Sequence, residues 1–121
     1  GIKTAEENNI KNIEFNGQII EVKQYLPVND KLALISNVIN ASADDYNFAN
    51  PVKVEVLLAL EIIVNYTNIN FTEKQREDSA KLYDLVCSSG LLNEVIKAIP
   101  EDEYEELYDG VHMSIEAIYS Y

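Results

Sequence analysis

The residues that could do chemistry gather near the C-terminus, where six of the nine residues 101–109 are acidic and none is basic. They are Glu101, Asp102, Glu103, Glu105, Glu106 and Asp109. Carboxylates bind divalent cations, but a calcium site needs a loop that folds round the ion with a glycine at its turn. These acids fall on a predicted helix, which spreads side chains around its axis. We therefore expect a solvent-facing acidic strip that could also dock a basic protein or mimic phosphate.

Two further groups have the residue types of a catalytic site but not its pattern. Asp109 and His112 lie three positions apart on one predicted helix, as an acid that orients a general base would. No motif links them to a nucleophile, so we interpret them as a surface ion pair. Cys87 has no basic neighbour in the sequence to activate it, and we expect it to be a small buried residue. The chain is therefore predicted to be no enzyme, with no cofactor and no metal site.

The composition favours one small, acidic domain over residues 1–121. The 121 residues are 47% apolar and carry a net charge of −12, which is uneven: −3 over residues 1–60 and −9 over residues 61–121. Such a charge repels nucleic acid and anionic membranes, so neither is expected as a direct partner. With one cysteine and one histidine the chain can form neither an internal disulfide nor a His/Cys zinc site. A lone cysteine is typical of an intracellular compartment.

The elements that must position these groups begin with a predicted β-hairpin over residues 12–26, after a loose leader over residues 1–11. Asn16-Gly17 separates two segments rich in β-forming residues, and this dipeptide is the strongest short hairpin signal because both turn residues need a positive φ. Alternation predicts that Ile20 and Val22 face inward. A lone hairpin is marginal in water, so its apolar face must lie on helices or pair with another chain.

Residues 30–121 are expected to form a helical body, so the predicted fold is mainly α: a bundle of four to five helices with an N-terminal hairpin. The expected helices span residues 30–42, 51–66, 73–89, 91–99 and 101–120. Asn29, Asn50-Pro51 and the Thr72–Gln75 capping box are the expected start signals, and Gly90 is an expected left-handed stop. The apolar face of the first helix should comprise Leu32, Ile35, Val38 and Ile39.

The apolar stripe of the last expected helix runs into tyrosines near the end of the sequence. Tyr119 and Tyr121 follow without a glycine, a proline or a basic cap. Tyrosine is enriched at protein interfaces because it buries a large area while keeping a polar group. We therefore expect that the natural chain continues, or that this end docks on a partner.

The order of elements, from the hairpin IEFNGQIIEVKQY through a helix to a proline-started helix and an acidic remainder, resembles small acidic helical proteins of tailed phages. It is also similar to tail assembly chaperones, which often open with a hairpin of the form GG-x-x-x-x-V or NG-x-x-x-x-V before a helical body. The resemblance implies a non-enzymatic protein of the host cytoplasm or the virion. Such a protein would act by protein–protein contacts in head or tail assembly, as an assembly chaperone or a minor virion component, and could form a homo-oligomer.

An alternative of a different class is an acidic inhibitor, or nucleic-acid mimic, that blocks a basic site on a host protein such as a defence nuclease or polymerase. The two hypotheses assign different roles to the acids of residues 101–109. An assembly protein would use the hairpin edge and the end of the last helix, and would tolerate neutral substitutions of the acids. An inhibitor would bind through the acids and release its partner as salt rises.

Overall fold

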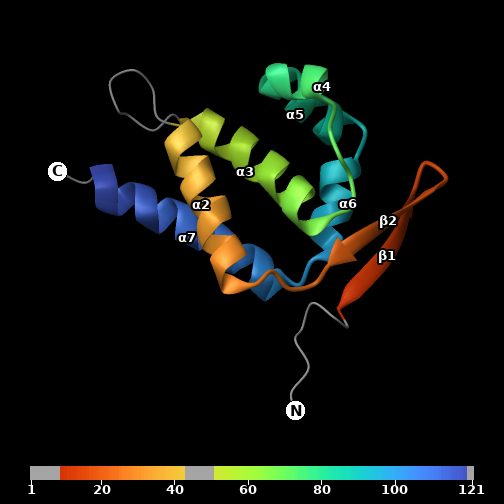
Figure 1. Ribbon diagram of the computed structural model, residues 1–121, viewed down its shortest axis with the longest axis horizontal. Coiled ribbons are helices and arrows are strands. Elements are labelled where there is room, and N and C mark those ends of the chain that lie inside the picture. The colour runs from red at the N-terminus through yellow and green to blue at the C-terminus, as the bar shows by residue number, and fades with distance from the viewer. Residues whose placement is uncertain (1–8, 43–50, 120–121) are drawn as a thin grey trace, which may run out of the picture.

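The computed structural model describes residues 9–42 and 51–119, the last two of these for their backbone only. In this part of the chain an antiparallel hairpin precedes six helices, which confirms the mainly α fold with an N-terminal hairpin (Figure 1). The elements are β1 (Ile10–Phe15), β2 (Gln18–Lys23), α2 (Val28–Ser42), α3 (Pro51–Tyr66), α4 (Glu73–Glu77), α5 (Ser79–Ser88), α6 (Leu91–Ala98) and α7 (Glu101–Tyr119).

The hairpin forms around the turn that the sequence predicts. Asn16 and Gly17 have φ values of 49° and 78°, and Phe15 pairs with Gln18 across the turn. Ile20 and Val22 of β2 are buried, as their alternation predicts. Strand β1 starts at Ile10, so the predicted leader is wrong for its last two residues, and residues 1–8 lie outside the described part.

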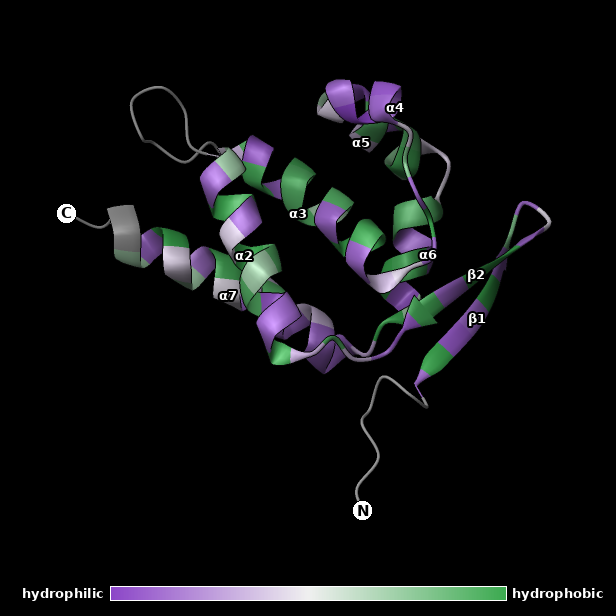
Figure 2. Ribbon diagram, in the orientation of Figure 1, coloured by the Kyte–Doolittle hydropathy of each residue, from purple (hydrophilic) through white to green (hydrophobic). Residues whose placement is uncertain are grey.

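Helix α3 is the central element and has apolar residues on nearly its whole circumference. One side packs into the main core, which it shares with the hairpin, α2, α6 and α7. The opposite side contributes Leu60 and Ile63 to a smaller cluster with Leu82 and Val86 of α5. In Figure 2 α3 is green over most of its length, whereas α4 is largely purple. The boundaries of this helix and its central burial confirm the prediction.

Helix α2 starts two residues before the predicted helix, and its buried face differs from the predicted one. The Pro27 carbonyl accepts hydrogen bonds from the backbone N–H groups of Asp30 and Lys31, so Asn29 lies within the first turn and is not the cap. Lys31 is buried, whereas Leu32 is 59% exposed. The predicted face is therefore wrong at Leu32, because the buried position belongs to a lysine that finds acidic partners on α7.

The expected helix over residues 73–89 is two helices, α4 and α5. The Thr72–Gln75 capping box forms as predicted. The carboxylate of Asp78 accepts from the backbone N–H of Lys81, which ends α4 and starts α5. Helix α5 then buries Leu82 and Val86 but leaves Leu85 54% exposed, although its spacing from Leu82 puts both leucines near one face. Gly90 has a φ of 85°, as expected for a left-handed stop.

Helices α2 and α7 touch at Gly110. A methyl group added at Gly110 would come 2.7 Å from Ile35 Cδ1, so the missing side chain lets the two helices approach closely. Leu107 and Val111 of α7 are buried beside this contact. A glycine that weakens the isolated helix therefore serves the packing of α7.

Candidate functional site

The six acids predicted as one strip divide into two sets in α7. Glu101, Asp102, Glu105, Glu106 and Asp109 are exposed. Glu103 is only 6% exposed and points into the protein. The expectation that all six face solvent is therefore wrong for Glu103, because a helix that carries acids at six of nine positions also turns one of them toward the core.

The Glu103 carboxylate collects hydrogen bonds from three separate segments. Oε1 accepts from the backbone N–H of Leu26 at 2.9 Å and from Tyr66 Oη at 2.8 Å. Lys31 Nζ lies 3.1 Å from Oε1 and donates to Oε2 at 3.2 Å. The carboxylate thereby ties the N-terminus of α7 to the end of the hairpin segment, to α2 and to α3. We call Glu103, Lys31, Tyr66 and Leu26 the Glu103 hub.

Lys31 has two further partners at the edge of the hub. Its Nζ donates to Glu106 Oε2 at 3.2 Å and lies 4.3 Å from the ring centroid of Tyr25. Burial lowers the pKa of Lys31, but the hydrogen bonds and charges of Glu103 and Glu106 outweigh it and leave the pKa above its ordinary value. Lys31 is therefore held in its charged form.

Tyr66 completes the hub from the end of α3. Burial raises its pKa, and the hydrogen bond to Glu103 raises it further because the phenol must donate to a carboxylate. The hydroxyl is thus kept protonated. Every polar group of the hub already has a partner within it, so its geometry is that of a structural junction.

The sequence contains one signal for the hub, at Lys31 in α2. The apolar face predicted for this helix did not include it. Lys31 precedes Leu34 and Val38 at the helical spacing of a buried face, and a lysine at such a position needs an acidic partner. Nothing in the local pattern points to Tyr66 or distinguishes Glu103 from its acidic neighbours. Those assignments depend on contacts between residues far apart in the sequence.

The structure gives His112 a different neighbour from the one predicted. Its Nε2 lies 4.0 Å from Glu55 Oε1 of α3, and its ring centroid lies 4.2 Å from that of Tyr108. Asp109 is exposed, and the contacts of His112 are with Glu55 and Tyr108. The expected surface pair of Asp109 with His112 is therefore replaced by a contact between α7 and α3.

Cys87 is exposed on α5, so the expectation of a buried residue is wrong. Helix α5 directs Leu82 and Val86 inward, which places the next residue toward solvent. A hydrogen bond with Cys87 raises the pKa of the Tyr83 phenol. Within residues 9–42 and 51–119, no three His, Cys, Asp or Glu side chains lie close enough together to hold a metal ion.

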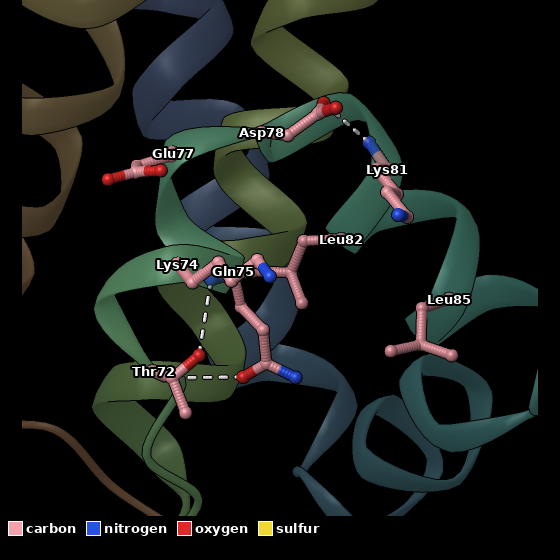
Figure 3. Close-up of a pocket in the computed structure, with 8 residues that line it drawn as sticks. All are labelled: Thr72, Lys74, Gln75, Glu77, Asp78, Lys81, Leu82 and Leu85. Atoms are coloured by element: carbon pink, nitrogen blue, oxygen red, sulfur yellow. Dashed lines mark hydrogen bonds between the residues drawn. The ribbon is translucent and has the colours of Figure 1, made fainter.

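A cleft of about 480 Å³ opens beside α4 and α5 (Figure 3). Its walls are Thr72, Lys74, Gln75, Glu77, Asp78, Lys81, Leu82 and Leu85. The backbone N–H of Thr72 donates to Gln75 Oε1, and the backbone N–H of Gln75 donates to Thr72 Oγ1. The backbone N–H of Lys81 donates to Asp78 Oδ1. Thr72, Gln75 and Asp78 are thus used in capping the two helices, and the other lining residues are two leucines and the charged Lys74, Glu77 and Lys81.

The contact residues predicted at the end of the chain lie outside the described side chains. Tyr119 ends α7, but its side chain lies outside the described part, as does all of Tyr121. None of the described helices is long and apolar enough to cross a membrane. Comparison with protein-family models, curated protein sequences and solved structures finds no match to this chain.

Substitution of Glu103 tests the division of the acids. Glu103→Gln keeps the side-chain shape but leaves the buried Lys31 charge without its main partner, so we expect a loss of about 3–5 kcal/mol in the free energy of unfolding. The matched control is Glu105→Gln, the same chemical change two residues away on the exposed side. It should not lower stability, because Glu105 is exposed and the charge of neighbouring acids, Glu101 foremost, raises its pKa, so neutralising it only relieves repulsion. Urea unfolding of both variants measures the difference, and equal losses would contradict the division.

The hub also predicts a loss of stability at alkaline pH. The pKa values of Lys31 and Tyr66 are raised above their ordinary values of 10.5 and 10.0, so the folded state holds both protons more tightly than the unfolded chain. This stabilisation is fully present below the unfolded pKa values and is lost as pH rises from there toward the folded ones. Urea unfolding at several pH values should therefore show a decline above about pH 10. The decline should be shallower in Tyr66→Phe, and equal slopes would exclude Tyr66 as a contributor.

Proposed function

We propose that this chain works through protein–protein contacts and that, as its resemblance to tailed-phage proteins implies, those contacts serve head or tail assembly. The chain would then be an assembly chaperone or a minor virion component. The structural support is the hairpin, because one of its two edges is covered within the chain and no described strand pairs with the other.

The covered edge belongs to β2. The outward backbone N–H of Glu21 donates to Asn68 Oδ1 at 3.1 Å, and Val22 forms an antiparallel bridge with Thr67 after α3. The α3–α4 connection therefore occupies this edge. The other edge belongs to β1, the outer strand of a two-stranded sheet in the described part of the chain.

The backbone groups on the β1 edge follow from the register. Phe15 and Gln18 flank a two-residue turn, and such flanking residues exchange hydrogen bonds with one another. Residues at alternate positions, Ile10, Asn12 and Glu14, therefore direct their N–H and C=O groups away from β2. Natural proteins protect edges of this kind, and an unprotected edge accepts a strand from another chain.

Exposed apolar residues reinforce this assignment. Ile10 of β1 and Ile19 of β2 lie on the solvent-facing side of the hairpin and are both largely exposed. Lys11, Glu14, Glu21 and Lys23 balance one another in charge, so the hairpin lacks the acidic excess of the rest of the molecule. A strand from a virion protein, or from a second copy of this chain, could add to β1 without strong electrostatic repulsion.

A proline at position 12 tests the edge. Asn12→Pro removes an outward N–H that the hairpin itself does not use, whereas Asn12→Ala keeps that donor and serves as the control. We expect tagged wild-type and alanine chains to recover portal, capsid or tail proteins from phage-infected cells, as identified by mass spectrometry. The proline variant should lose them while keeping its circular dichroism spectrum. Capture of the same virion proteins by the proline variant, or of a basic host protein alone, would contradict the proposal.

A further inference from the structure

A second surface, separate from the hairpin edge, lies where α2 and α7 meet. Val28 and Leu32 of α2 are exposed, and Met113 of α7 is 67% exposed. Isolated exposed apolar residues are ordinary, but several on one surface mark an interaction site. The positions of these residues on the two helices decide which case applies.

The helical spacing places the exposed apolar residues of α2 at the edge of its contact with α7. Val28, Leu32 and the half-buried Ile39 recur at i, i+4 and i+11 and so lie in one row. This row borders Ile35, which meets α7 at Gly110, and Lys31, which bonds to Glu106 of α7. The row therefore runs beside the line where α7 joins α2.

Met113 continues the same surface on α7. Glu106 and Gly110 contact α2, and Met113 is the next residue in the i, i+4, i+7 series that follows them. We call Val28, Leu32, Ile39 and Met113 the α2–α7 apolar ridge. It spans two packed helices, and the surface formed by two such helices is one on which a third helix can pack.

The flank of this ridge on α7 is acidic. Asp102, Glu106, Asp109 and Glu116 share the exposed side of α7 next to Met113, at i, i+4, i+7 and i+14. Helix α7 has no lysine or arginine, and the single base of α2, Lys31, is buried in the Glu103 hub. The surface therefore combines apolar residues at helical spacing with a one-sided row of negative charge.

We infer that the α2–α7 apolar ridge binds a basic amphipathic helix of a partner protein. Apolar side chains of such a helix at i, i+4 and i+7 would cover the ridge, and lysines or arginines on its flank would pair with the acids of α7. A second copy of this chain fits poorly here, since it would bring the same acidic row against this one. The inference does not rest on the role proposed for the hairpin.

The test uses the full chain and two synthetic peptides. One is a helical peptide with leucines at i, i+4 and i+7 and lysines and arginines beside them. The other has the same composition in a scrambled order that removes the apolar face. Fluorescence anisotropy with labelled peptides should show that the amphipathic peptide binds at least about tenfold more tightly than the scrambled one. Its binding should weaken, without vanishing, as salt rises, since only part of the contact is electrostatic.

Matched substitutions locate the contact. Leu32→Ser and Asp109→Asn should each weaken binding of the amphipathic peptide, Leu32→Ser by about tenfold. Leu85→Ser removes an exposed leucine of similar exposure, 54% against 59%, from the distant α5 and should have no effect. Equal binding of the two peptides, or equal effects of the two leucine substitutions, would overturn the inference. So would a concentration-dependent dimer that Leu32→Ser dissociates, because the occupant would then be a second copy of the chain.

Discussion

The packing of this small domain depends on one buried carboxylate. A charged Glu103 inside the protein is costly unless donors surround it, and its donors come from the end of the hairpin segment, from α2 and from α3. All three meet the carboxylate only when α7 is docked on the rest of the molecule. The hub is therefore a polar junction that fixes where the N-terminus of α7 sits, while Gly110 allows close approach to α2 farther along the helix.

The parts of the fold that could be predicted from the sequence are those governed by local rules. The Asn16-Gly17 turn, the capping box at Thr72 and the apolar circumference of α3 each follow from residues close together in the chain. The errors share a different cause. Lys31 takes the buried position in place of Leu32 because it pairs with Glu103. This partner lies 72 residues away, so the local spacing of apolar residues could not predict the pair. Likewise, Glu103 differs from the acids around it only through Tyr66 and Leu26, 37 and 77 residues distant.

The candidate contact surfaces follow from the same division between buried and exposed groups. With Glu103 turned to the interior, Asp102, Glu106, Asp109 and Glu116 form an exposed acidic row on α7. The β2 edge is covered, and among the described strands β1 is the one with an unpaired edge. The two surfaces differ in chemistry, one offering backbone hydrogen bonds near electrical neutrality and the other apolar contact with negative charge.

The most direct measurement is a double-mutant cycle between Lys31 and Glu103. Lys31→Met and Glu103→Gln each remove one charge while keeping most of the side-chain volume, and urea unfolding gives the stability of both single variants and of the double variant. If the buried pair organises the fold, each single change strands the charge left behind and the double change relieves it. The double variant should then lose less stability than the sum of the single losses, by about 1–3 kcal/mol. Additive losses would show that the two residues act independently and that the hub is not what holds α7 in place.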